Sequence, residues 1–224
     1  RKSTNPWAVN AWGSSVYVDG TGTTSFDAAM VIDESDNLYL IGVSPYATIS
    51  NSIVCKKKTP GGAWGSTQTI ATAGYPWQFV LSDVTVGKEA SGQKSVWGSF
   101  FAFNSVTSAY QDCIVIRSTD GAANWKGITG GNFSLPLSTT SGVLSDSNGI
   151  AYSGSNAYVS RLCVDSDGTH VHLSMWDLTA GYPKYKRGTI GTGWASFTQN
   201  FTASNTHGAM EQVGSTLVYI HAGP

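Results

Sequence analysis

Short stretches in which apolar and polar residues alternate recur along this chain, each bounded by Gly, Asn, Asp or Ser. Alternation with a period of two is typical of a half-buried β-strand, and the bounding residues favour turns. The clearest stretches are residues 38–44, 95–103, 113–118, 170–176 and 216–222. No long segment has the period of an amphipathic helix, and 26 glycines supply the positive φ angles that tight turns need. The sequence therefore predicts an all-β protein.

A second pattern repeats at a longer spacing. It consists of a basic strand end, a turn, and a Trp followed by small or hydroxylated residues, and its four copies end at Trp12, Trp64, Trp125 and Trp194. Such repetition favours a β-propeller over a sandwich or barrel. We expect one domain over residues 1–224 that forms a propeller of about four blades of antiparallel strands.

The expected blades cover about residues 26–71, 76–135 and 145–203, and the fourth is split between the two ends of the chain. Residues 207–224 would supply its first two strands and residues 1–20 its outer strand. Pairing of the two ends would close the ring and protect the sheet edges. A slice of a larger propeller is the alternative reading.

Residues 118–125, with the sequence STDGAANW, resemble the Asp box, S-x-D-x-G-x-x-W, of bacterial neuraminidase repeat (sialidase-like) propellers. The segment departs from the pattern at Ala122, where the family has Gly. The Trp64 and Trp194 copies keep this glycine but have Thr59 and Thr189 in place of the Asp. The resemblance covers most of the chain as a repeat and eight residues as a motif.

We expect a structural role for the box. An Asp in a hairpin turn can accept hydrogen bonds from turn amides, a Gly tolerates positive φ, and a Trp can pack beneath the turn. The residues that we assign to this structural repeat are Ser118, Asp120, Trp125, Trp12, Trp64 and Trp194.

The resemblance to this family would also imply sialidase activity. Enzymes of that kind are expected to hold the substrate carboxylate with three arginines and to use a Tyr nucleophile, a Glu and a separate Asp. The four arginines of this chain are Arg1, Arg117, Arg161 and Arg187, and only Arg161 falls in an inner-strand segment. We therefore expect no sialidase site and no catalytic residues.

The acidic residues and histidines have structural explanations. Six of the 14 acidic residues fall in expected hairpin turns, although such turns can also bind calcium. These six are Asp33, Glu34, Asp36, Asp120, Asp165 and Asp167. His170 and His172 alternate along one strand and so share a face, which a metal could use if His207 or His221 came near. We expect no metal and no cofactor. The cysteines Cys55, Cys113 and Cys163 lie in apolar segments, where free Cys is a small hydrophobe.

Charge excludes some classes of partner. The chain has 13 Lys and Arg against 14 Asp and Glu, and charged residues are only 12% of the total. This balance predicts no binding to nucleic acid or anionic lipid. No apolar run reaches the length of a membrane-spanning helix, so we expect no membrane insertion.

The aromatic residues point to a different ligand. The chain has 8 Trp, 10 Tyr and 8 Phe, more than the repeat requires. A neutral surface rich in rings, amides and hydroxyls suits carbohydrates. The candidate ligand-binding residues are Trp97, Trp176, Arg161, His172, Tyr46 and Tyr182.

We therefore expect a non-catalytic, extracellular glycan-recognition module, either lectin-like or phage receptor-binding. Its partner would be a glycan or a cell-surface polysaccharide. One alternative is a structural component of a virion or fibre, with a protein partner in that assembly. The other is a fragment of a sialidase-like glycoside hydrolase whose missing blades carry the catalytic residues.

Overall fold

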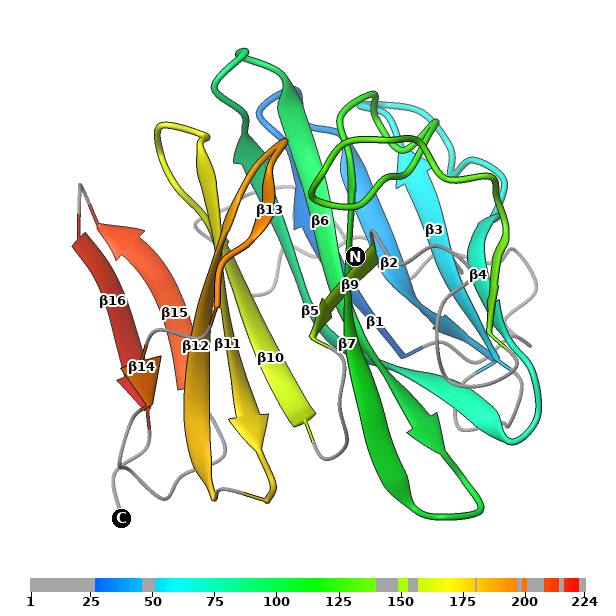
Figure 1. Cartoon of the computed structure of the whole chain (residues 1–224). Helices are drawn as coiled ribbons and strands as arrows, with labels where there is room; N and C mark the ends of the chain where they lie inside the picture. Colours follow the sequence, from blue (N-terminus) through cyan, green and yellow to red (C-terminus); the bar gives the residue numbers. More distant parts are fainter. Residues whose placement is uncertain are drawn as a thin grey trace, which may run out of the picture.

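The computed structural model describes residues 27–45, 51–139, 149–152, 157–179, 181–196, 199–200, 208–213 and 216–221. The described chain consists of strands, turns and loops without an α-helix, so the all-β prediction is confirmed (Figure 1). In this part of the chain, no helix is long and apolar enough to cross a membrane.

The first sheet is an antiparallel meander. It contains β1 (Asp27–Ile32), β2 (Leu38–Ser44), β3 (Ser52–Lys58) and β4 (Gln68–Ala73), each paired with the next. A fifth strand, β8 (Leu137–Thr139), pairs with β4 in parallel at the outer edge.

The second sheet repeats this order with longer strands. It contains β5 (Trp77–Lys88), β6 (Lys94–Asn104), β7 (Ala109–Ser118) and the short outer strand β9 (Ile150–Tyr152). We expected the outer strand of this unit before residue 135. Instead, β9 pairs with β7, and residues 137–139 join the first sheet.

The third sheet contains β10 (Ala157–Val164), β11 (His170–Asp177) and β12 (Tyr182–Thr189), with β13 (Gly193–Trp194) and β14 (Gln199–Asn200) both paired to β12.

A fourth sheet is formed by β15 (Gly208–Val213) and β16 (Thr216–His221), which pair in antiparallel fashion. None of the described sheets closes into a barrel.

The four sheets follow one another in chain order across the molecule (Figure 1). The first strand of each sheet contacts the first strand of the next sheet. Thus β1 contacts β5, β5 contacts β10, and β10 contacts β15. The turns β1–β2, β5–β6 and β10–β11 all lie at the same end, which is the upper end in Figure 1.

Two apolar cores separate the first three sheets. Along β6, Val96 and Phe100 face the core shared with the first sheet, whereas Trp97 and Phe101 face the core shared with the third. All four side chains are at most 3% exposed. A strand buried on both faces carries apolar residues at consecutive positions, which explains the nearly continuous apolar sequence of β6.

Two polar side chains join neighbouring sheets. The amide of Asn51, which is 1% exposed, accepts the N–H of Phe79 at 2.6 Å and donates to the Phe79 carbonyl at 2.8 Å. The Asp83 carboxylate accepts the N–H of Leu162 at 2.8 Å. These bonds attach β5 to the first sheet and β10 to β5.

Candidate functional site

The turn formed by residues 118–125 is built around the Asp120 carboxylate. Its Oδ1 accepts the N–H of Asn124 at 2.9 Å, the N–H of Ala123 at 3.1 Å and the Ser118 hydroxyl at 2.8 Å. Its Oδ2 accepts the Asn124 side-chain amide at 2.8 Å. Partial burial alone would raise the pKa of Asp120, but the hydrogen bonds outweigh burial and lower it.

Backbone conformation and packing complete this turn. Gly121 has φ 73° and Ala122 has φ 71°, so the position at which the family has Gly is left-handed here as well. Trp125 is fully buried and donates its Nε1–H to Gln68 Oε1 at 2.8 Å. The expected local geometry of the motif is therefore present, while membership of the Asp-box family stays a prediction.

A second carboxylate organises the β1–β2 turn. Asp33 Oδ1 accepts the N–H groups of Ser35 at 2.8 Å and Asn37 at 3.0 Å, and Oδ2 accepts the Tyr39 hydroxyl at 3.0 Å. The Asn37 side-chain amide also donates to both Asp33 oxygens. Burial opposes these hydrogen bonds, but their sum lowers the pKa of Asp33.

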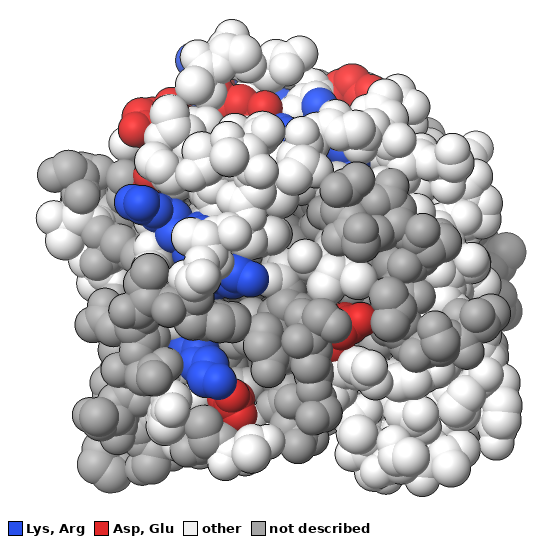
Figure 2. All heavy atoms as spheres, in the orientation of Figure 1, with Lys and Arg blue, Asp and Glu red and all other residues white. Residues whose placement is uncertain are grey.

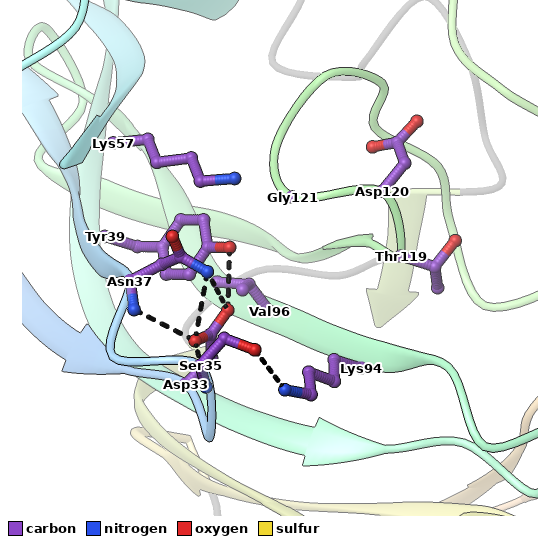
Figure 3. Close-up of a pocket in the computed structure, with 10 residues that line it drawn as sticks. All are labelled: Asp33, Ser35, Asn37, Tyr39, Lys57, Lys94, Val96, Thr119, Asp120 and Gly121. Atoms are coloured by element: carbon purple, nitrogen blue, oxygen red, sulfur yellow. Dashed lines mark hydrogen bonds between the residues drawn. The ribbon is translucent and has the colours of Figure 1, made fainter. Parts of the chain in front are cut away.

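A pocket of about 350 Å³ opens between these two turns (Figure 3). It lies where the first and second sheets meet, at the end of the molecule that carries the first turns. The lining residues are Asp33, Ser35, Asn37, Tyr39, Lys57, Lys94, Val96, Thr119, Asp120 and Gly121.

Two lysines contribute positive charge to the pocket. Lys57 extends from β3 toward the loop that carries Gly121 (Figure 3), and its Nζ lies 5.5 Å from the centre of the Tyr39 ring. A Cβ at Gly121 would lie 2.6 Å from Lys57 Nζ, so glycine leaves room for this ammonium group. Lys94 donates to the Ser35 hydroxyl and lies 3.9 Å from Glu34.

The third sheet holds a separate polar cluster. His172 Nε2 lies 2.5 Å from Asp165 Oδ1, and His172 Nδ1 lies 2.5 Å from the Tyr185 hydroxyl. Because a carboxylate only accepts, Nε2 carries a proton, and Nδ1 lies within hydrogen-bonding distance of the Tyr185 hydroxyl. Burial raises the pKa of Tyr185 against the opposing charge of Arg187, which disfavours a phenolate.

The β10–β11 turn could hold a cation. One ligand atom each from Asp165, Asp167 and His170 lies within 4.8 Å of the others. Hydrogen bonds within the turn already account for these groups, since Asp167 accepts from Thr169 and Asp165 from His170. These hydrogen bonds stabilise the hairpin turn and explain why the three side chains lie close together.

The predicted sugar-stacking rings are not on the surface. Trp97 is 0% exposed and donates its Nε1–H to Ser95 Oγ at 2.8 Å, and Trp176 is 7% exposed. Trp97 lies on a strand that is covered by a sheet on each side, so its ring belongs to the core and cannot stack on a ligand. Trp176 lies at the end of β11, opposite Pro183 of β12.

The other predicted ligand-binding residues do not converge. His172 is buried and both of its ring nitrogens are engaged, whereas Arg161 is half-buried and donates to the Ser82 carbonyl at 3.3 Å. Tyr182 is half-buried at the start of β12. Tyr46 lies outside the described residues.

The repeat tryptophans differ in their surroundings. Trp125 is fully buried, whereas Trp64 and Trp194 are half-buried. Trp64 forms an isolated β-bridge with Lys58, and Lys186 Nζ lies 6.0 Å from the Trp194 ring centre. Trp12 lies outside the described residues.

Sequence reasoning missed the residues that line the pocket. Asp33 and Asn37 were recognised as turn residues, and Lys57 as part of a basic strand end. The available signal was that the β1–β2 turn and the 118–125 turn both end strands at the same edge of neighbouring sheets. Recognising it would have required knowing which sheets are neighbours.

No protein-family model and no curated protein matches the sequence. The fold is similar to two solved structures of "a new family of Polysaccharide lyase PL25-Ulvanlyase", each with a TM-score of 0.58 over 82% of this chain. Sequence identity is 13% and 14%, and the second structure is bound to -[GlcA(1-4)Rha3S]-. This chain covers 46% of each lyase chain.

A protein of unknown function from Dyadobacter fermentans also matches, with a TM-score of 0.36 and 12% identity over 87% of this chain and 75% of that one. At these identities the likeness to the lyases shows a shared β-rich fold.

Proposed function

We propose that this protein is a non-catalytic polysaccharide-binding module with a β-propeller arrangement, and that it binds glycan in the pocket between its first two sheets. The succession of antiparallel sheets, with each first strand against the next, supports the propeller. The fold similarity to a polysaccharide lyase supports a glycan ligand.

The pocket is the observation that carries this proposal. Its volume lies at the lower end of the range for small-ligand sites, roughly 300–1,000 Å³. Ser35, Asn37 and Thr119 place hydroxyl and amide groups around it, and these groups can both donate to and accept from sugar hydroxyls. Both turns that form its walls are fixed by side-chain hydrogen bonds, so little ordering is needed when a ligand binds.

The end of the molecule that carries the first turns is polar. In Figure 2, acidic and basic side chains gather at the upper end, over the turns, and further charged side chains of both signs lie lower on the same face. A polysaccharide that crosses this end can place one residue in the pocket, where charged groups of both signs lie beside hydroxyl and amide groups.

The two pocket carboxylates favour binding over hydrolysis. Glycosidases use one carboxyl group as a general acid, and its pKa is raised for that task. Hydrogen bonds lower the pKa of both Asp33 and Asp120. Neither group is therefore suited to donate a proton at neutral pH.

The test compares two variants on equivalent turns. Ser35→Trp places a bulky ring at the rim of the pocket, whereas Ser91→Trp makes the same change at an exposed position of the β5–β6 turn. Binding to a panel of neutral and acidic polysaccharides is measured by affinity electrophoresis. We expect Ser35→Trp to abolish the retardation and Ser91→Trp to leave it unchanged.

Equal retardation of both variants would place the glycan elsewhere and overturn the proposal. Retardation by no polysaccharide would favour the virion or fibre component, and release of shortened chains would favour the glycoside hydrolase fragment. The extracellular location is part of the same proposal.

A further inference from the structure

Each of the first three sheets has a ring-bearing side chain next to a basic side chain at an equivalent place. In each sheet, a ring on the second strand lies directly opposite a basic residue on the third. These rings lie on the face directed toward the following sheet, as the cores containing Tyr39 and Trp97 show. The pairs are Tyr39 with Lys57, Trp97 with Arg117, and His172 with Arg187.

A carboxylate begins the first turn in each of the same sheets. Asp33, Glu89 and Asp165 each donate their backbone N–H to the carbonyl that closes the turn, at 3.0, 2.8 and 3.0 Å. The three residues therefore occupy equivalent positions, and each sheet carries one carboxylate, one ring and one cation near the same end.

In the second sheet, the cation is in contact with both the ring and the carboxylate. The Arg117 guanidinium lies 5.4 Å from the Trp97 ring and forms an ion pair with Glu89. Arg117 also donates to the Gly127 carbonyl at 3.2 Å and is 3% exposed. A cation at this position is thus held by a ring on one side and by a carboxylate on another.

In the first sheet, the carboxylate is turned away. Asp33 is occupied by Asn37, Ser35 and Tyr39. Lys57 retains its place near the Tyr39 ring, but none of the described residues forms a hydrogen bond or an ion pair with its ammonium group. The pocket opens beside this cation.

The third sheet provides a contrast. There the turn carboxylate, Asp165, binds His172, and Arg187 is exposed to solvent. Lys57 is partly buried and borders a pocket. Asp33 and Asp120 also line this pocket, but their carboxylates are bound within their own turns, and neither forms an ion pair with Lys57.

We propose that the pocket binds the anionic group of an acidic sugar residue through Lys57 Nζ, with the ligand supplying the carboxylate that Glu89 supplies in the second sheet. This inference rests on the proposed glycan-binding function. A lysine ammonium is a compact positive charge that donates hydrogen bonds to the oxygens of a carboxylate or a sulfate. Lys94 also lines the pocket, but its ammonium group lies 3.9 Å from Glu34 Oε2, so the anion site rests on Lys57.

The test compares charged and uncharged forms of the same oligosaccharide, so that the contribution of the anionic group is measured by itself. Isothermal titration calorimetry is performed with an oligogalacturonate, with the same oligosaccharide after reduction of its carboxyl groups to alcohols, and with sulfated and unsulfated dextran oligosaccharides. Because a hydrogen bond to a charged group is worth more than a neutral one, we expect the oligogalacturonate to bind about tenfold more tightly than its reduced form.

Three variants assign this preference to one side chain. Lys57→Met is expected to remove the preference while the reduced oligosaccharide still binds, and Lys57→Arg is expected to keep it. Lys88→Met makes the same change of net charge at an exposed residue outside the pocket, and it is expected to leave the preference intact. The thermal midpoint of each variant verifies that it is folded.

The outcomes are distinguishable. Equal affinity of the wild-type protein for the charged and uncharged members of both pairs, oligogalacturonate and dextran, would overturn the anion site and leave the glycan-binding function standing. Failure to bind any oligosaccharide would overturn both. A preference for sulfated over unsulfated dextran that disappears in Lys57→Met would support the anion site and identify sulfate as its source.

Discussion

The role of an aromatic residue in this protein depends on how many sheets cover its strand. Trp97 and Tyr39 both come from alternating segments that predict half-buried strands, yet they are 0% and 1% exposed. Composition indicated more rings than the repeat needs, whereas the consecutive apolar residues of β6 are the local sign that sheets cover both faces of this strand. The glycan-stacking role of Trp97 was wrong for this reason.

Trp97→Ala is expected to reduce the free energy of unfolding by about 3–5 kcal/mol, the cost of truncating a large core aromatic. The substitution also removes the ring beside Arg117. Urea denaturation measures the effect. A loss of less than about 1 kcal/mol, combined with a loss of glycan binding, would return Trp97 to the ligand-binding surface.

Acid should weaken the protein through Asp120. The pKa of Asp120 is lowered in the folded state, so the stabilisation is present above the unfolded value of about 3.9 and is lost as pH falls below it. Asp120→Asn is expected to lower the thermal midpoint at pH 7 and to flatten its fall toward pH 3.

The matched change is Asp36→Asn in the β1–β2 turn, where the side chain is exposed. This variant should follow the wild-type profile. An Asp120→Asn profile as steep as that of the wild type would show that other carboxylates control the acid transition.

At the scale of elements, strands were predictable and some pairings were not. The segment 38–44 coincides with β2, and the segments 95–103 and 170–176 lie within β6 and β11. By contrast, β9 reaches β7 across more than thirty residues of chain, and β8 joins β4 in parallel. Such contacts depend on the path of the connecting loops, which alternation does not encode.

A few polar side chains form hydrogen bonds that connect neighbouring sheets. Asn51→Ala is expected to reduce the free energy of unfolding by about 2–5 kcal/mol, because the N–H and carbonyl of Phe79 lose their partners in a buried place. Ser52→Ala, which removes an exposed hydroxyl on the next residue, should cost less than about 0.5 kcal/mol. Equal losses would show that Asn51 does not join the sheets.

At the scale of the whole molecule, the order of the sheets creates the pocket. Two turns far apart in sequence, residues 33–37 and 118–125, meet because the first sheet packs against the second. The sequence indicates each turn and its structural Asp, but the pocket depends on the packing of sheets. The expected ring closure by residues 1–20 falls outside the described residues.

A crystal structure of the protein with a bound oligogalacturonate tests the central claim most directly. The account predicts that a sugar residue occupies the pocket between the β1–β2 turn and residues 118–125, with its carboxylate within hydrogen-bonding distance of Lys57 Nζ. An oligosaccharide bound at another surface, with the pocket holding only water, would contradict it.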